Sequence, residues 1–258
     1  QFVNFGGYEY YVNSIRVREF SEFNNLLTAY QAGISGNWQV SPDHELCFQI
    51  MNNRNGNDED VYPTGLPEGT AKAKIPFMYT VNWNSYYLDK TLQLRYATAV
   101  GQQTRKRYSY YFTCGNTYEK GPLLTYLDVM YTRQGIDQHG VVSRLPGTPH
   151  TAMNTEYLSI IGDVDYRVHP QWNVYVKGAY ETARVYKSNG DFRKGMYRRS
   201  WNAQSSVEFF PFKQLDLFVF VLYTYRGVIL EKAATQMGAI EPDTHRISLG
   251  LVYSIPIF

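Results

Sequence analysis

The sequence predicts an all-β fold: a transmembrane antiparallel β-barrel with about 12 strands in this chain, in a single domain over residues 1–258. Three observations predict it. Large apolar residues alternate with polar ones along most of the chain, short and long connections alternate between these segments, and the chain holds 24 Tyr, 14 Phe and 4 Trp. The mean hydropathy of −0.40 averages two opposite faces, so it does not indicate a soluble protein.

Each strand is predicted from period-two alternation, the pattern of a strand with one apolar and one polar face. The predicted strands are, in order, 1–12, 27–40, 45–53, 72–84, 90–102, 106–116, 121–133, 153–168, 171–186, 198–211, 215–228 and 244–258. The clearest alternating apolar residues are Tyr30, Ala32, Ile34, Gly36 and Trp38 in 27–40; Ile75, Phe77, Tyr79, Val81 and Trp83 in 72–84; Leu92, Leu94 and Tyr96 in 90–102; Leu158, Ile160, Val164 and Tyr166 in 153–168; and Ile247, Leu249, Leu251, Tyr253 and Ile255 in 244–258. No segment of comparable length has a helical period.

The connections between the strands alternate in length. The short ones are 41–44, 85–90, 117–121, residue 170 and 212–214, and the long ones are 13–26, 54–71, 134–152, 187–197 and 230–243. The joint at 102–105 is the exception, because it is short where a long loop is expected. One edge with tight turns and another with long loops is typical of an outer-membrane barrel, whose short turns face the periplasm.

Strand length and aromatic placement favour a membrane barrel over a soluble sandwich or barrel. Several segments have about 12–16 residues, whereas a tilted strand crosses a membrane in about 9–11 and soluble strands usually have about 5–6. Aromatic residues near segment ends on the apolar face are typical of interfacial girdles. They are Tyr30, Trp38, Tyr79, Trp83, Trp172, Tyr223 and Tyr253. A soluble fold must explain a polar lining on nearly every strand.

Other classes of protein are disfavoured. A net charge of +2 does not indicate the strongly basic surface of a nucleic-acid-binding protein. No apolar run approaches the length of a transmembrane helix, which needs about 18 residues. The sequence shows no metal cluster, phosphate-cradling glycine loop or Ser/His/Asp spacing, so we expect neither an enzyme nor a cofactor. Asp43-His44 lies in a predicted periplasmic turn, and 52–59 lacks the ordered spacing of a calcium loop. Cys47 and Cys114 are expected to stay unpaired.

The segments Gln1–Tyr10, Arg18–Phe23 and Thr244–Leu251, together with the terminal Phe258, resemble the phosphate-selective porin (OprO/OprP-like) family of Gram-negative outer membranes, in a Bacteroidetes-type version. The resemblance implies a multi-pass outer-membrane barrel. Family members have about 16 strands, so the chain would be a C-terminal portion of a longer barrel. The implied partners are the lipid bilayer and lipopolysaccharide, the barrel-assembly machinery, small hydrophilic solutes or anions, and a second and third copy in a homotrimer.

The alternation assigns charged residues to the lumen. The cationic positions are Lys74, Arg95, Arg107, Arg167, Lys177, Arg226 and Arg246, and the equally numerous anionic ones are Glu45, Asp128, Asp163, Asp165, Glu181, Glu208 and Asp216. The predicted pore-lining residues are Arg16, Arg18, Lys74, Arg95, Arg107, Asp163, Asp165, Arg167, Lys177, Glu181, Arg226 and Arg246. A phosphate-selective pore needs a cationic ladder, so the balance predicts only a weak ion preference. Cross-strand pairing of these charges is the alternative to solute contact.

The predicted function is passive diffusion of small hydrophilic solutes through a polar lumen. The alternative is a narrow or plugged barrel that acts as an adhesin, a receptor or an assembly component. Bulky residues on the lumen face favour this alternative: Tyr126, Tyr157, Tyr175, Phe210, Phe218 and Phe220. The loop 13–26, with Arg16 and Arg18, either packs against the inner wall or projects outward.

Overall fold

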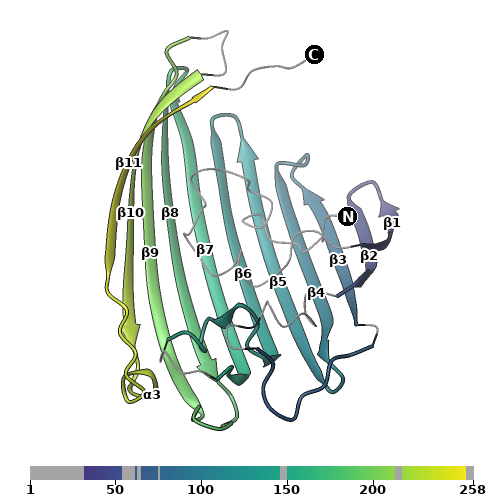
Figure 1. Ribbon diagram of the computed structural model, residues 1–258. Coiled ribbons are helices and arrows are strands. Elements are labelled where there is room, and N and C mark those ends of the chain that lie inside the picture. The colour runs from purple at the N-terminus through teal and green to yellow at the C-terminus, as the bar shows by residue number, and fades with distance from the viewer. Residues whose placement is uncertain are drawn as a thin grey trace.

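The computed structural model describes residues 32–53, 62, 65–74, 76–145, 150–212 and 217–253. Within these ranges, 11 antiparallel strands form one sheet in which the strands follow one another in sequence order (Figure 1). The elements are β1 Gly33–Ser41, β2 His44–Asn52, β3 Phe77–Tyr87, β4 Leu92–Thr104, β5 Arg107–Lys120, β6 Leu123–Ile136, the 3₁₀ turn η3 Gln138–Gly140, β7 Met153–His169, β8 Trp172–Val185, β9 Gly195–Phe209, β10 Leu217–Leu230, α3 Lys232–Thr235 and β11 Thr244–Tyr253.

The all-β prediction and the strand order are confirmed. Each described strand overlaps one predicted segment, and the predicted strand 1–12 lies outside the described residues. The predicted start of the segment 72–84 is wrong, because β3 begins only at Phe77. Pro76 precedes it and has no N–H to donate to a ladder, although its carbonyl oxygen accepts a 2.9 Å hydrogen bond from the Asn53 backbone N–H.

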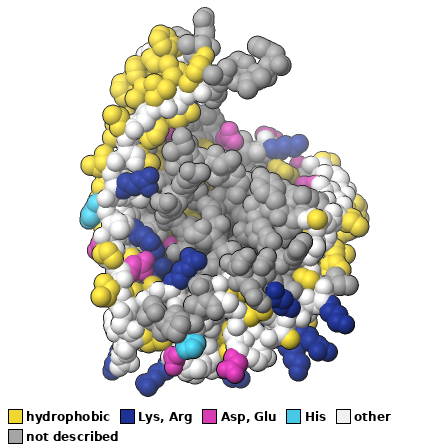
Figure 2. Space-filling model, viewed as in Figure 1, with side chains coloured by type: hydrophobic (Ala, Val, Ile, Leu, Met, Phe, Trp, Pro, Cys, Tyr) yellow, Lys and Arg dark blue, Asp and Glu magenta, His cyan; other side chains and the backbone are white. Residues whose placement is uncertain are grey.

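The sheet curls into a trough with two different faces (Figure 1). Large apolar side chains such as Trp38, Phe112 and Trp201 are exposed on the convex face, and Figure 2 shows hydrophobic side chains along the outer margins of the molecule. Polar side chains such as Thr113 and Ser200 are buried on the concave face. A single sheet with its apolar side chains outside and its polar side chains inside does not fit the soluble-sandwich alternative. In a sandwich, two sheets bury their apolar faces against each other.

The two outermost described strands have unpaired edges. β1 and β11 lie on opposite sides of the trough in Figure 1, and within the described ranges no ladder joins them. Almost every residue of both strands is exposed or half-buried, on both faces. The described part of the barrel is therefore open between β1 and β11. None of the helices in the same ranges is long and apolar enough to cross a membrane.

The connections confirm the predicted asymmetry between the two ends of the sheet. The connections between β1 and β2, β3 and β4, β5 and β6, β7 and β8, and β9 and β10 are short and start from one end of the sheet. The longer connections between β2 and β3, β6 and β7, β8 and β9, and β10 and β11 start from the other end, which we call the long-loop end. The β4–β5 connection, Arg105 and Lys106, is the predicted exception, because it is short although it lies at the long-loop end. Cys47 on β2 and Cys114 on β5 form no disulfide with each other.

The apolar convex face predicts a depth-dependent cost for a charge. Val81 lies in the middle of β3 and Val207 near the end of β9, and both side chains are exposed on the convex face. We expect Val81→Arg to destabilise the protein in lipid by about 2–4 kcal/mol and Val207→Arg by about 0–1 kcal/mol. Guanidinium unfolding in lipid vesicles measures both. Equal costs for the two variants would contradict a lipid-facing surface.

Candidate functional site

Strand pairing places most of the predicted pore-lining residues on the concave face. These are Arg95, Arg107, Asp163, Asp165, Lys177, Glu181, Arg226 and Arg246. Arg16 and Arg18 lie outside the described residues. Lys74 lies in the exposed β2–β3 connection, because β3 starts after Pro76, so its assignment to a strand was wrong.

Arg167 lies at the rim of the trough rather than in its middle. It follows the irregularity in β7 that shifts the β7–β8 register after Tyr166. Its guanidinium donates to the Pro170 carbonyl oxygen at 3.1 Å and lies 4.0 Å from the centroid of the Phe210 ring. Cation–π contact and this hydrogen bond hold the side chain at the short-turn end.

A buried charge pair lies on the concave face between β7 and β8. Asp163 and Lys177 are opposite each other in the ladder, and Lys177 is only 1 % exposed. The register thus puts the two side chains on the same face at facing positions, as the predicted cross-strand pairing requires. A charge with so little solvent access needs an opposite charge or hydrogen bonds close by to remain ionised.

The neighbouring carboxylates use neutral donors instead. Glu181 accepts hydrogen bonds from Ser159 Oγ at 2.9 Å, Asn202 Nδ2 at 3.2 Å and Ser200 Oγ at 3.5 Å. Asn173 Nδ2 is shared between Asp165 Oδ1 at 2.7 Å and Glu208 Oε2 at 3.0 Å. Donors from the adjacent strands reach these carboxylates, so hydrogen bonds connect the polar side chains of the wall from β7 to β9.

The other strands extend this network across the sheet. Tyr175 Oη donates to Gln204 Oε1 at 2.8 Å, and Gln204 Nε2 donates to Thr224 Oγ1 at 3.0 Å. Toward the other edge, Thr80 Oγ1 donates to Gln49 Oε1 at 3.2 Å. The concave face is thus lined by hydrogen-bonding groups from β2 to β10.

One charged residue of this face, Arg198, and the carboxylate that it contacts, Glu241, were missed in the sequence. The register between β8 and β9 shifts at a bulge, where Met196 and Arg198 face consecutive residues of β8 and leave Tyr197 as the extra residue. Arg198 is buried on the concave side, and it forms an ion pair with Glu241 of the β10–β11 connection at 3.6 Å. Arg198 has the same parity as Asn202, Gln204 and Glu208, so the alternation of the predicted strand 198–211 already carried the signal that places it inward.

The long-loop end is organised around the buried carboxylate of Asp137, just after β6. Its Oδ2 accepts from the Val142 N–H at 3.0 Å, the Ser143 N–H at 2.7 Å and Ser143 Oγ at 2.6 Å, and its Oδ1 accepts from Tyr157 Oη. Burial raises the pKa of the Asp137 carboxyl, and the hydrogen bonds oppose this shift. Since Tyr157 belongs to the concave face of β7, these bonds fold the β6–β7 connection inward over the trough.

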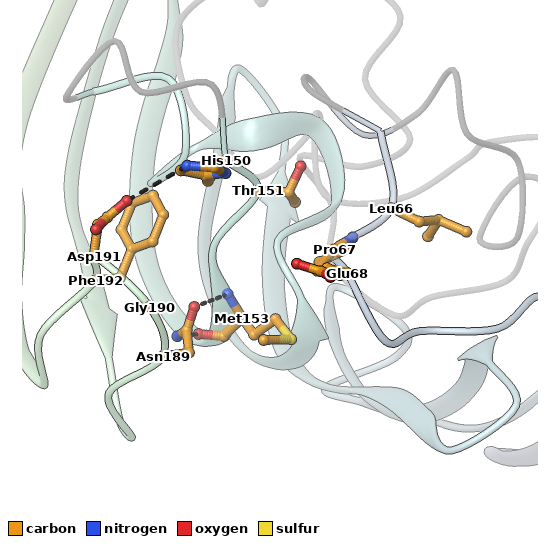
Figure 3. A pocket seen from close by; sticks show the side chains of 10 residues that line it. All are labelled: Leu66, Pro67, Glu68, His150, Thr151, Met153, Asn189, Gly190, Asp191 and Phe192. Atoms are coloured by element: carbon orange, nitrogen blue, oxygen red, sulfur yellow. Dashed lines mark hydrogen bonds and ion pairs between the residues drawn. The ribbon is translucent and has the colours of Figure 1, made fainter.

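A cavity of about 400 Å³ lies among three of the connections at this end (Figure 3). Glu68, His150 and Asp191 line it, and His150 Nε2 lies 3.7 Å from an Asp191 carboxylate oxygen. Asn189 closes one side by accepting from the Met153 N–H at 3.0 Å and donating to the Met153 carbonyl oxygen at 2.5 Å. The described residues include no group of three or more His, Cys, Asp or Glu side chains placed to hold a metal ion.

His44, which follows Asp43 and could form an acid–base pair with it by sequence, belongs to the outer surface. His44 stacks on Trp83 with ring centroids 5.6 Å apart, and its Nδ1 lies 3.1 Å from Ser85 Oγ. That hydroxyl oxygen already accepts from Trp83 Nε1 at 2.7 Å. The cluster lies at the short-turn end, where aromatic residues of an interfacial girdle are expected.

Comparisons with known proteins agree with this arrangement. The sequence model of the family described as "Phosphate-selective porin O and P" matches residues 1–255. No curated protein matches the sequence.

Solved structures of outer-membrane proteins share the fold. The outer membrane channel DcaP of Acinetobacter baumannii matches with a TM-score of 0.56 and 10 % identity, over 87 % of this chain and 62 % of the DcaP chain. The loop L8 deletion mutant of OmpT from Vibrio cholerae matches with a TM-score of 0.55 and 12 % identity, over 98 % of this chain and 73 % of the other. The chain therefore spans less than two thirds of the DcaP length.

The facing positions of Asp163 and Lys177 predict a large coupling free energy between them in a double-mutant cycle. We expect Lys177→Met to destabilise the protein by about 3–5 kcal/mol, because it leaves a buried carboxylate without its facing charge. Asp163→Asn combined with Lys177→Met should recover most of that loss. Guanidinium unfolding of the wild type, both single variants and the double variant measures the coupling. A Lys177→Met variant as stable as the wild type would contradict the pairing.

The Asp137 hydrogen bonds predict a local effect at the long-loop end. Asp137→Ala leaves the N–H groups of Val142 and Ser143 without their acceptor, at about 1–3 kcal/mol for each donor that stays buried. We expect limited proteolysis to cleave within 137–152 much faster in this variant. Asp191→Ala is the control, because the contact of Asp191 with His150 is exposed. The idea fails if both variants are cleaved at the wild-type rate.

Proposed function

The chain belongs to the phosphate-selective porin O and P family of outer-membrane β-barrel porins, and we propose that it forms the wall of a passive diffusion path for small hydrophilic solutes. A family of porins is not one of enzymes, which agrees with the sequence-based expectation. The activity of the complete protein is proposed here, since the chain spans only part of the matched channels.

The observation that carries this proposal is the inverted polarity of the sheet. Tryptophan, phenylalanine and valine side chains are exposed on the convex face, while carboxylates, amides, hydroxyls and cationic groups line the concave one. A barrel in lipid needs this arrangement when water and solutes pass inside it. Hydrogen-bonding groups along the concave wall can replace part of the hydration shell of a polar solute.

We propose that this path has only a weak preference between anions and cations. Cationic and anionic side chains of the described strands nearly balance on the concave side: Arg95, Arg107, Lys177, Arg198, Arg226 and Arg246, against Glu45, Glu119, Asp128, Asp163, Asp165, Glu181 and Glu208. Selective phosphate binding needs an excess of Arg and Lys along the path. The balance argues against extending the phosphate selectivity in the family description to these strands.

We further propose that strands beyond β1 and β11 complete the barrel. Both edges are unpaired among the described strands, and an open edge in lipid leaves N–H and C=O groups without partners. The matched channels are also longer than this chain. The predicted single domain over 1–258 would then be the C-terminal part of a longer barrel. An intact mass above 29.9 kDa for the protein from native membranes would support this.

The remaining partners follow from insertion in an outer membrane and stay predictions. They are lipopolysaccharide, the barrel-assembly machinery and a homotrimer. Phe258, the terminal aromatic of the assembly signal, lies outside the described residues, and so do most of the residues behind the Bacteroidetes-type resemblance.

A second candidate is a narrow or plugged barrel that serves as an adhesin, a receptor or an assembly component. The observation that favours it is the burial of the concave-face residues Tyr126, Tyr157 and Tyr175. Large buried side chains on this face reduce the width available to a solute.

Conductance decides between the two candidates. Protein purified from outer membranes and added to a planar bilayer should give discrete current steps, and its reversal potential in a tenfold KCl gradient should lie close to zero. The absence of steps would favour the plugged barrel. Steps with a strongly anion-selective reversal potential would overturn the proposed weak preference alone.

A further inference from the structure

The β10–β11 connection, residues 231–243, folds onto the trough instead of projecting away from it. Its short helix α3 lies beside the end of β10 (Figure 1). Ala234 and Ala239 are buried in one cluster with Tyr197 of β9 and Phe192 of the β8–β9 connection. Tyr197 Oη also donates to Met237 Sδ at 3.8 Å. Apolar packing therefore holds this connection against the inner side of the wall.

Glu241, near the end of this connection, reaches two cationic side chains of the concave face. Its Oε1 lies 2.9 Å from Arg226 Nη2 and 3.6 Å from Arg198 Nη1. The Arg198 side chain is only 6 % exposed, so the interaction is weakly screened by water. Glu241 Oε2 is buried and has no hydrogen-bond partner among the described residues.

The two arginines come from adjacent strands, and this carboxylate contacts both of them. Arg198 is opposite Leu230 in the β9–β10 ladder, whereas Arg226 is opposite Asn202. They are therefore separated by four positions, about 13 Å along the strands. One carboxylate oxygen between two guanidinium groups leaves the trio with a net charge of one, where the arginines alone would carry two.

The same connection carries a second carboxylate on the opposite side of the wall. Glu231 Oε1 accepts from Arg199 Nε at 2.7 Å. Arg199 follows Arg198 in β9 and faces the convex side, opposite Ile229 and Thr182. One connection thus makes two Glu–Arg links, with Glu241 inside the trough and Glu231 outside it.

We propose that Glu241 sets the charge selectivity of the pore at its long-loop end. Its carboxylate cancels one of the two arginine charges on the concave face, and without it Arg198 and Arg226 attract anions to this point of the path. Low-dielectric walls focus the field of such charges on the solutes that pass. This inference rests on the proposed diffusion path and names the residue that keeps its ion preference weak.

Matched neutral variants test the inference. Glu241→Gln and Glu231→Gln each remove one negative charge from the same connection and retain the side-chain size. In a tenfold KCl gradient, we expect Glu241→Gln to raise the anion-to-cation permeability ratio several-fold, and Glu231→Gln to leave it at the wild-type value. Adding Arg226→Gln to Glu241→Gln restores the net charge of the trio and should return the ratio toward that of the wild type.

The outcomes separate the inference from the proposed function. Conductance steps with an unchanged ratio in Glu241→Gln, or an equal shift in Glu231→Gln, overturn the role of Glu241 and leave the diffusion path intact. A wild type without conductance overturns both. Proteolysis within 231–243 serves as the structural readout: if Glu241 only held the connection in place, Glu241→Gln would be cleaved faster without any change in the ratio.

Discussion

The constraint on which the structure depends is the absence of hydrogen-bonding partners in lipid. Every N–H and C=O group within the hydrocarbon layer must bond inside the protein, and the continuous ladder from β1 to β11 achieves this for the interior strands. The ladder fixes side-chain direction with a period of two. Lipid then requires one face of each strand to be apolar, and the other face is left for polar residues. The aromatic excess and the negative mean hydropathy are consequences of the same rule.

That rule also explains how much the sequence could predict. Alternation is local, so strand existence, strand order and the facing of Asp163 and Lys177 followed from neighbouring residues. Lys74 shows the limit of this rule: Ile75 and Phe77 continue the alternation in the sequence, but Pro76 has no N–H to donate to a ladder, and β3 starts after it. Arg198 was overlooked, although the alternation of β9 puts it on the same face as Asn202 and Glu208. Glu241 and Asp137 lie in connections, where no periodicity links a carboxylate to the strand that it contacts.

The charges inside the trough are held in two different ways. Between β7 and β9, Asp165, Glu181 and Glu208 accept hydrogen bonds from amides and hydroxyls, which fix their orientation. At the long-loop end, Glu241 meets cations directly. A wall that mixes these arrangements keeps charges of both signs along one path, and it does so with side chains whose positions are set by rigid strands.

The strands differ in length, and the difference shapes the surroundings of the barrel. β1 has 9 residues and β7 has 17, so at a tilt of about 45° they rise about 21 Å and about 40 Å, against an apolar band about 25 Å tall. The wall is therefore low beside β1 and high around β7. A higher wall separates the concave face from the charges of the lipid headgroups over a longer distance than a low one does. Lipid composition should then influence entry from one flank of the protein more than from the other.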